Sequence, residues 1–364
     1  MNHFTPQARL VADIGGTNAR FGWQADRAAP IEHVQTLRCA DFATLEDAIR
    51  AYLDGAALAV PPVCGIGIAT PITGDAVRMT NHHWAFSQRD LRTRLGLARL
   101  LVINDFTALA LAVPVLQAGA LRQVGGGAAV AGAAIGVLGP GTGLGVSGLV
   151  PRGDPDGAGD RSVDGRGDGD GDGIGIGIGI GIGHGEAGVY LPLQGEGGHV
   201  TLAADTLREF AALDVLRRRY GHASAERVVS GQGLLDLCTA LCEVDGITPV
   251  PASTAADVTR QALDASNPTC TEALQMFCGF LGSVAGNLAL TLGAQGGVYI
   301  GGGIVPRLGT WFDGSPFRSR FEAKGRFRGY LAAIPTFVID ANVAPSLIGA
   351  ARALDSMAGG SHGA

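Results

Sequence analysis

The sequence predicts an α/β protein made of two related halves. Residues 9–23, RLVADIGGTNARFGW, read as an apolar strand, a glycine turn and a returning strand. Residues 133–150, AAIGVLGPGTGLGVSGLV, repeat this pattern. Apolar strand segments alternate with segments of helical spacing elsewhere in the chain, as in α/β folds. Because each half offers a hairpin, an all-parallel dinucleotide-binding sheet is not expected.

Local patterns predict the other elements in turn. Leu45, Ile49 and Leu53 recur at helical spacing within residues 43–54. Residues 100–113 read as a strand that ends at Asn104-Asp105 and then a helix, which Pro114 ends. The remaining predicted elements are strands at residues 63–70 and 334–341, helices at 228–243, 271–293 and 345–354, and a strand, glycine turn and helix start at 296–308.

Composition limits the class of protein. The 364 residues suffice for two domains with separate cores. Hydrophobic residues make up 46% and charged residues 16%, as in a globular chain. The net charge of −6 gives no basic surface for nucleic acid. No run reaches the ~18 apolar residues of a membrane helix, and the N-terminus has no signal-peptide pattern, so no membrane partner and a cytoplasmic location are expected.

The numbers and positions of lysine and cysteine limit the ways in which the chain could bind a nucleotide or a metal. Lys324 is the only lysine, and it lacks the glycine-rich lead-in of a Walker A loop. A protein-kinase fold needs a strand lysine of its own. A nucleotide triphosphate would therefore have to be held by backbone amides and a metal. The six cysteines form no C-x-x-C pair, and we expect them to be buried core residues.

The first glycine turn is a candidate phosphate site. Gly15 and Gly16 let the backbone approach a phosphate closely, and Thr17 adds a hydroxyl donor. Asp13 ends the preceding strand, where its carboxylate could hold Mg²⁺ directly or through water. Taken alone, the motif also fits an ordinary hairpin turn.

The second turn, GPGTGLG at residues 139–145, can do the same from the other half. Leu144 occupies the sixth position, where a dinucleotide-binding G-x-G-x-x-G motif has glycine. A third glycine motif, at residues 301–307, offers a flat surface for an adenine ring or a ribose, or simply a tight strand-to-helix turn.

Asp105 is a candidate general base. Phosphoryl transfer to a hydroxyl needs a carboxylate that accepts the proton and orients the attack. In α/β folds, strand ends place such groups, and Asn104-Asp105 ends an apolar strand. An isolated Asp at this point could equally be a helix N-cap.

Two further motifs carry polar groups suited to sugar hydroxyls. Glu196 and His199 lie on the glycine loop GEGGH at residues 195–199. No second His or Cys stands at ligand spacing, which argues against His199 as a metal ligand. Glu226, in the SAER stretch ahead of the predicted helix 228–243, could bind another hydroxyl or could be a surface residue of a capping box.

Residues 152–188 consist almost entirely of Gly, Asp and Ile. Such a segment has a high ordering cost and little side chain to bury, so a disordered insertion is expected. Asp168, Asp170 and Asp172 match the first half of a calcium loop. Gly179 stands where that loop needs a bidentate Glu, so calcium binding is not expected.

Taken in order, these motifs resemble the bacterial glucokinase family of the hexokinase–actin superfamily. The resemblance runs from about residue 9 to about residue 355. The stretches that carry it are ADIGGTNAR, ATPITGDAVRMTNHHWAFS, LVINDFTALA, GPGTGLGV, LPLQGEGGHV, GHASAERVVSGQGL, GGVYIGGGIVPR and FEAKGRFRGYL. The GEGGH and SAER stretches are specific to this group among sugar kinases.

The resemblance implies a two-domain actin-like ATPase fold of ribonuclease H-like topology, with a cleft between the domains and usually a homodimer. The small domain would comprise residues 9–113 and about 340–357, and the large domain residues 114–339. Residues 152–188 would interrupt the family pattern. Residues 80–87, TNHHWAFS, would support the sugar pocket, with Trp84 and Phe86 in the core.

The implied activity is ATP-dependent phosphorylation of glucose to glucose 6-phosphate with Mg²⁺, the first step of glycolysis. By analogy, Asp105 would be the general base on the glucose 6-hydroxyl. Asn104, Glu196, His199 and Glu226 would bind the sugar. The phosphates would lie against Ala12, Asp13, Ile14, Gly15, Gly16 and Thr17, joined by Gly141, Thr142 and Gly143, with Gly302 near the adenosine and Asp13 toward the metal.

Two alternatives stay open at this point. The chain could phosphorylate another hexose, such as mannose, fructose or an amino sugar. It could also be a sugar- and ATP-binding regulator without turnover. The presence of every expected polar site residue and the lack of a DNA-binding extension before residue 9 disfavour the regulator.

Overall fold

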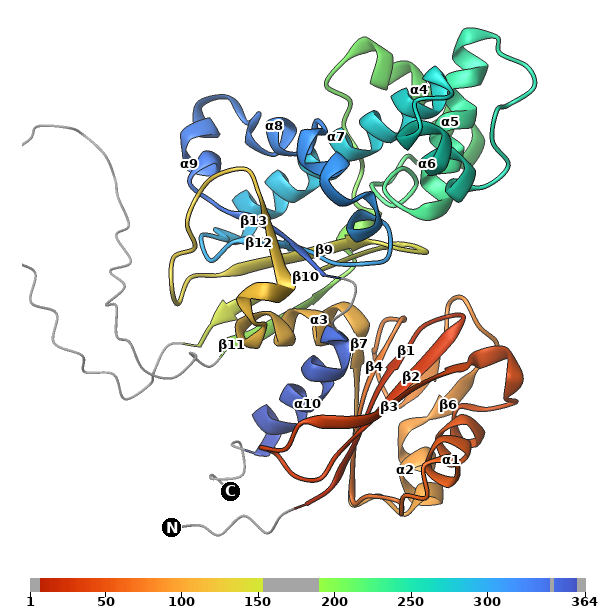
Figure 1. The fold of residues 1–364 in the computed structure, drawn as a ribbon, viewed down its shortest axis with the longest axis vertical. Helices are drawn as coiled ribbons and strands as arrows, with labels where there is room; N and C mark the ends of the chain where they lie inside the picture. The colour runs from red at the N-terminus through yellow and green to blue at the C-terminus, as the bar shows by residue number, and fades with distance from the viewer. Residues whose placement is uncertain (1–6, 153–189, 341–343, 359–364) are drawn as a thin grey trace, which may run out of the picture.

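A computed structural model of the chain describes residues 7–152, 190–340 and 344–358. The expected disorder and the calcium-loop match of residues 152–188 therefore fall almost wholly outside the described residues. Two mixed sheets form the centres of two lobes. In Figure 1 the lobe with the N-terminal sheet lies below the other lobe. The predicted α/β class with two related halves is confirmed.

The first sheet has the strand order β3-β2-β1-β4-β7, and the second has the order β11-β10-β9-β12-β13-β8. The strands of the first are β1 (Arg9–Ile14), β2 (Asn18–Gln24), β3 (Ile31–Arg38), β4 (Val63–Ile68) and β7 (Arg99–Asn104). Those of the second are β8 (Leu121–Val124), β9 (Ile135–Pro140), β10 (Leu144–Pro151), β11 (Tyr190–Gly195), β12 (Val298–Ile300) and β13 (Thr336–Ile339). A separate hairpin pairs β5 (Ala76–Arg78) with β6 (Ala85–Ser87).

The two sheets share one topology. In the first, β1 pairs antiparallel with β2 and parallel with β4, and β4 pairs parallel with β7. In the second, β9 pairs antiparallel with β10 and parallel with β12, and β12 pairs parallel with β13. Because β2 also pairs antiparallel with β3, and β10 with β11, the repeat that the glycine hairpins predict extends to five strands in each half.

Two helices connect the lobes. Helix α3 (Asp105–Ala112) follows β7 of the first sheet but also packs on β9, β10 and β11 of the second. Helix α10 (Pro345–Ala358) follows β13 of the second sheet and packs on β1 and β4 of the first. The two helices also pack on each other, and Figure 1 shows α10 lying with the lower lobe. Asp105 therefore stands at the junction of the lobes.

Helices α1 (Leu45–Gly55) and α2 (Gln88–Leu95) belong to the first lobe, and α4 (Leu207–Tyr220), α5 (Gly231–Asp245), α6 (Ala255–Leu263), α7 (Pro268–Leu292), α8 (Phe317–Glu322) and α9 (Arg328–Ala332) belong to the second. Of these helices, α1 and α2 pack on strands of the first lobe and α7 packs on β9, whereas α4, α5 and α6 pack on one another and on α7. The sequence prediction did not include α2, α4, α6, α8 or α9.

Helix α1 is close to its predicted range because Thr44 and Asp47 form a capping box at its start. Helix α7 begins three residues before the predicted 271, since the Asn267 side chain accepts the backbone N–H of Cys270. The helix predicted from residue 228 begins instead at Gly231, because Ser230 caps it through the N–H of Gly233. The segment after the third glycine motif is 3₁₀-helical, Val305–Gly314.

Burial tests two further expectations. All six cysteines are unpaired and buried, as predicted. Contrary to the expectation that no segment is apolar enough to span a membrane, α7 is long and apolar enough by length and composition. However, 72% of its apolar window is buried inside the molecule, which is typical of a core helix.

Candidate active site

The end of β7 places Asp105 in a fixed orientation. Asn104, and not Asp105, is the N-cap of α3: its Oδ1 accepts the N–H groups of Phe106 and Thr107 at 2.9 and 3.2 Å. The N-cap alternative for Asp105 is therefore wrong. Asn104 Nδ2 donates to Asp105 Oδ1 at 3.0 Å, as does the N–H of Phe106. Among the described residues, Oδ2 of Asp105 accepts no hydrogen bond and is free to take a proton.

Phe106 fixes this turn against the second half. A Cβ atom at Gly145 would fall 1.8 Å from the Phe106 ring, so the ring packs directly on the glycine backbone of β10. Only glycine allows this approach. The residue after the candidate base is thus tied to the strand that follows the second glycine turn.

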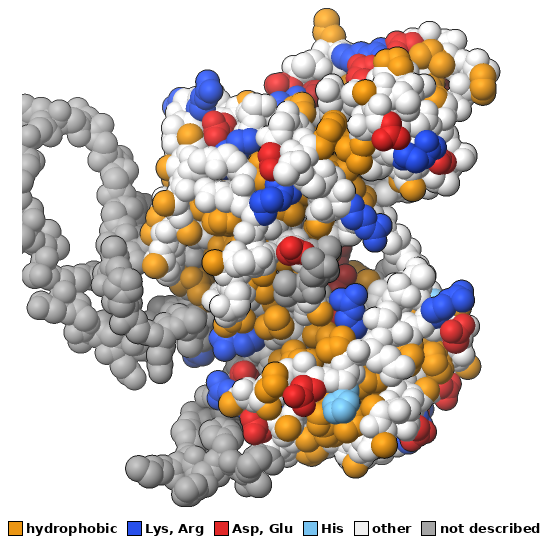
Figure 2. All heavy atoms as spheres, in the orientation of Figure 1, with side chains coloured by type: hydrophobic (Ala, Val, Ile, Leu, Met, Phe, Trp, Pro, Cys, Tyr) orange, Lys and Arg blue, Asp and Glu red, His pale blue; other side chains and the backbone are white. Residues whose placement is uncertain are grey.

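Two neighbouring carboxyl groups, those of Asp105 and Asp13, have raised pKa values. Burial raises the pKa of Asp105 to about 6, with a further contribution from the charge of Glu196, against the lowering effect of the hydrogen bonds from Phe106 and Asn104. Burial and the charge of Asp105 raise the pKa of Asp13 to about 6, and Arg20 opposes this shift. The surface is hollowed between the two lobes in Figure 2. Perturbed carboxyl groups at strand ends are typical of catalytic sites.

The first glycine turn presents backbone donors. Gly15 N–H bonds to Asn18 O at 2.9 Å, whereas the N–H groups of Gly16 and Thr17 make no hydrogen bond to any described residue. A Cβ atom at Gly16 would approach Asn81 to 3.1 Å. The sequence-predicted residues Ala12 and Ile14 are fully buried, so only their backbone could take part in binding.

The second turn has the same arrangement. Gly141 N–H bonds to Gly143 O at 2.8 Å, and the N–H groups of Thr142 and Gly143 make no hydrogen bond within the part of the chain that the structure describes. Each half therefore offers two consecutive free amides at the tip of a hairpin. Such concave sets of N–H groups are suited to phosphate.

Glu226 connects the second turn to the GEGGH loop. Its Oε2 accepts the N–H of Leu144 at 2.9 Å, and its own N–H donates to Gly198 O at 2.8 Å. It lies on a turn before α5, so the capping-box alternative is wrong. Its other oxygen, Oε1, makes no hydrogen bond to a described residue. This long-range contact between residues 226 and 144 has no signal in the sequence.

Glu196 and His199 lie together on the loop. His199 Nε2 is 4.0 Å from Glu196 Oε2, and their side chains are 61% and 56% exposed. The 3₁₀ turn Gly197–His199 holds them, with His199 N–H donating to Glu196 O at 3.0 Å. The charge of Glu196 contributes to the raised pKa of Asp105, so the two carboxyl groups lie within electrostatic range of each other.

A cavity of about 630 Å³ opens beside the second turn. Gly141 and Thr142 line it together with Gly303 and Ile304 of the third glycine motif. Gly302 has a φ of +81°, and a Cβ atom there would fall 2.4 Å from Pro140 O, so the two loops are in backbone contact. Helix α6 contributes a wall that the sequence prediction missed, formed by Ala255, Ala256, Thr259, Arg260 and Leu263.

Residues 80–87 lie beside the first turn through Asn81. Trp84 is 2% exposed and donates from Nε1 to Phe42 O at 3.1 Å. Phe86 packs against the same core cluster. The expectation that both aromatic residues belong to the core is confirmed.

The residues present fit a Mg²⁺–phosphate complex. The described residues contain no cluster of three or more His, Cys, Asp or Glu that could form a closed protein metal cage. Mg²⁺ is usually bound through one or two carboxylates plus phosphates and water. The Asp13 carboxylate accepts no hydrogen bond from the described residues, and the charge of Asp105 acts on it, so it remains available for this role.

Two solved structures that are similar to this one are sugar kinases. A glucokinase from an Antarctic psychrotroph is 34% identical, with a TM-score of 0.76, over 96% of this chain and 99% of that one. A ROK family glucokinase from Streptomyces griseus shares the fold at 18% identity and a TM-score of 0.57. The fold and the site define a sugar kinase with the two-domain actin-like architecture.

Sequence comparison specifies the family. The Glucokinase family model matches residues 10–158 and 170–357. The glucokinase of Aromatoleum aromaticum is 52% identical over 98% of this chain and 97% of its own length, and that of Chromobacterium violaceum is 46% identical over 95% and 89%. The chain belongs to the glucokinase family. The match is interrupted at residues 159–169, a shorter stretch than the expected insertion 152–188.

Proposed function

We propose that this protein transfers the γ-phosphoryl group of ATP to the 6-hydroxyl of glucose. The single observation that carries this proposal is the convergence of Asp13, Asp105 and Glu196 with two amide-donating glycine turns at the junction of the lobes. The family membership of the whole chain supports the same reaction.

Asp105 acts as the general base. Its free Oδ2 accepts the proton of the 6-hydroxyl as that oxygen attacks phosphorus, while Asn104 and the Phe106 N–H hold Oδ1. The raised pKa of Asp105 makes it a better proton acceptor than an exposed carboxylate while leaving it ionised at pH 7. The remaining sugar hydroxyls contact Asn104, Glu196, His199 and Oε1 of Glu226.

The phosphates lie between the two turns. Amides of Gly16 and Thr17 approach from one half, and those of Thr142 and Gly143 from the other. Asp13 orients Mg²⁺ through water or directly. When bound, the metal supplies charge neutralisation on the phosphate oxygens. The adenosine occupies the cavity of about 630 Å³ between the second turn, α6 and Gly302-Gly303.

Approach of the lobes would align the reacting groups and exclude water, which would otherwise compete with the sugar hydroxyl. We assign residues 9–113 and about 340–357 to the small domain and 114–339 to the large domain. We also propose a cytoplasmic homodimer that catalyses the first step of glycolysis.

A coupled assay of ADP release across a hexose panel tests the function. The full chain, with ATP and Mg²⁺, is expected to turn over glucose with a higher kcat/KM than mannose, fructose or glucosamine. A higher kcat/KM for another hexose would show that this hexose, and not glucose, is the preferred substrate. Absence of turnover with every hexose, together with measurable ATP and glucose binding, would favour the regulator.

A further inference from the structure

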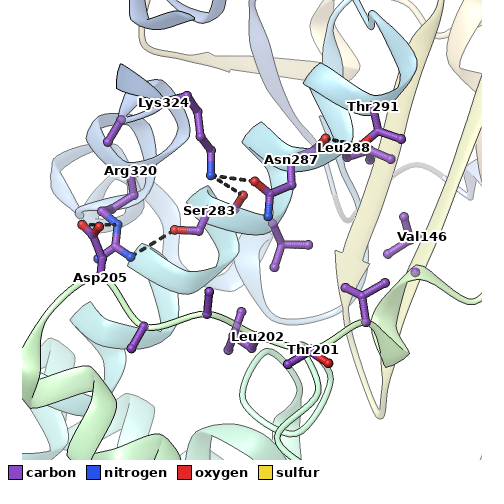
Figure 3. A pocket seen from close by; sticks show the side chains of 16 residues that line it. Val146, Thr201, Leu202, Asp205, Ser283, Asn287, Leu288, Thr291, Arg320 and Lys324 are labelled. Carbon is purple, nitrogen blue, oxygen red and sulfur yellow. Dashed lines mark hydrogen bonds and ion pairs between the residues drawn. The ribbon is translucent and has the colours of Figure 1, made fainter. Parts of the chain in front are cut away.

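A second pocket lies on the large lobe, next to the GEGGH loop. It has a volume of about 350 Å³ and is enclosed by β10, residues 200–205, α7 and the end of α8 (Figure 3). It includes Lys324, within the stretch FEAKGRFRGYL, which carries the family resemblance but contributes nothing to the proposed glucose or ATP contacts. We name it the Lys324 pocket.

Lys324 presents an unpaired cation to this pocket. Its ammonium group donates to Asn287 Oδ1 at 2.7 Å and to the Ser283 carbonyl oxygen at 3.2 Å, both on α7. Figure 3 shows the side chain extending toward these two residues. Within the described residues, Lys324 forms no ion pair. A half-buried ammonium group that donates only to neutral acceptors can form an additional, charge-assisted hydrogen bond to an anion.

The neighbouring charges do not neutralise Lys324. Arg320 pairs with the buried carboxylate of Glu209 and lies 3.7 Å from Asp205. Its guanidinium also donates to Ser283 Oγ at 3.1 Å. Partial burial and the charge of Arg320 lower the pKa of Lys324, and Asp205 opposes this shift. Arg320 therefore adds positive charge beside the ammonium group, and Asp205, which also lines the pocket, offsets part of it.

The rest of the wall is largely apolar. Val146, Val200, Leu202, Val284 and Leu288 line the pocket beyond the polar groups. In Figure 3, Leu288 and Val146 lie on the side away from Arg320. A ligand with one anionic group and a compact apolar body would match both parts.

The pocket also touches the sugar loop. Gly197 lies in its wall, between Glu196 and His199 in the sequence. A Cβ atom at Gly197 would fall 2.9 Å from Val146, so the loop is closely packed on the strand that bounds the pocket. A ligand against Val146 and Val200 would therefore bias the position of this loop.

We propose that the Lys324 pocket is an effector site for a small organic anion, with a phosphate or carboxylate group at Lys324 and an apolar body against Leu288 and Val146. Its occupancy changes the KM for glucose through the GEGGH loop. The effect on KM rests on the proposed glucose phosphorylation, whereas binding itself does not.

The single lysine allows a direct binding test. With [ε-¹³C]lysine in the full chain, the only lysine side-chain signal reports Lys324. Phenyl phosphate and phenylacetate serve as anionic probes, and benzyl alcohol as the uncharged control. We expect at least one anion to shift the signal saturably and at least tenfold more tightly than benzyl alcohol. No saturable shift with either anion, or equal affinity for the alcohol, would overturn the site.

Variants locate the binding. By calorimetry, Lys324→Met should weaken binding of the preferred anion at least tenfold, whereas Lys324→Arg and the exposed control Arg328→Met should stay within threefold of wild type. Thr291→Phe, which fills the edge of the pocket without removing the charge, should also abolish binding. If Lys324→Met does not fold, the Thr291→Phe result decides. Unchanged binding in Thr291→Phe would place the anion elsewhere.

Steady-state kinetics test the coupling. The preferred anion should change the KM for glucose at least twofold in wild type and leave it unchanged in Thr291→Phe. A saturating NMR titration with no change in KM would overturn the effector role. If the enzyme does not phosphorylate glucose, the NMR titration still tests the site independently.

Discussion

The two halves of the molecule share a strand order but differ in their chemistry. Each has a glycine hairpin with two free amides at its tip, at Gly16-Thr17 and at Thr142-Gly143. The first hairpin follows a carboxylate, Asp13, whereas the second follows Pro140 and receives its carboxylate from Glu226, 82 residues from Leu144. The backbone repeat thus places free amides in both halves, whereas the acidic side chains, to which we assign the metal, the base and the sugar contacts, are distributed unequally between them.

Among the changes that compare the two hairpins, the largest expected effect comes from removing the charge that distinguishes the first. Asp13→Asn should lower kcat by about 10²–10³-fold, because the metal–phosphate complex would lose the carboxylate proposed to hold it. Steady-state kinetics with a Mg²⁺ titration measure this effect. The exposed Asp54→Asn should behave as wild type. Equal kcat in the Asp13 variant and this control would remove Asp13 from the site.

A matched glycine pair tests the second hairpin. A Cβ atom at Gly143 would fall 2.4 Å from Glu226 Oε2, but one at Gly141 would meet nothing within 4 Å. Gly143→Ala should therefore displace Glu226 and raise the KM for glucose about 10–100-fold. Gly141→Ala should leave it nearly unchanged and affect mainly the KM for ATP. The same change in both variants would argue that Glu226 does not bind the sugar.

The acid limb of the pH profile tests the two neighbouring carboxyl groups. The base must be ionised, and the pKa values of Asp13 and Asp105 are about 6. The value of kcat/KM should therefore fall as the pH drops below about 6, by roughly tenfold per unit for each required carboxylate. Asp13→Asn should make this limb shallower. A rate that stays constant down to pH 4.5 would contradict both shifts.

The smallest expected effect is on thermal stability, which replacement of Asp105 should increase rather than decrease. A carboxyl group whose folded-state pKa is raised destabilises the fold when ionised, fully so above pH 6 and not at all below its unfolded pKa of about 3.8. Asp105→Asn should therefore raise the Tm by a few degrees at pH 8, with the difference disappearing near pH 3.5. Calorimetry at both pH values measures it. A lower Tm at pH 8 would show that Asp105 stabilises the fold.

The sequence allowed prediction of those elements that local patterns determine. The hairpins, β4, β7 and α7 combine apolar runs with glycine or proline punctuation, so their existence was clear. The observed helix starts differ from the predicted ones where a capping side chain sets the first residue of the helix, as at Asn267 and Ser230. Helix α4 has a mixed polar sequence, which weakens its helical pattern.

For the site, motifs in the sequence pointed to candidate residues but not to the contacts between them. The contact of Glu226 with Leu144, the packing of Phe106 on Gly145 and the α6 wall of the cavity beside the second turn depend on the placement of distant segments. No local pattern encodes these distances. The family resemblance supplied the grouping that residue spacing could not.

The most direct measurement compares binding and turnover in Asp105→Ala. If Asp105 takes the proton only during reaction, kcat should fall by about 10²–10⁴-fold or more. Calorimetric affinities for glucose and for ATP should stay within about tenfold of wild type. Turnover close to wild type, or a loss of activity explained entirely by lost glucose binding, would contradict the assignment of Asp105 as the general base.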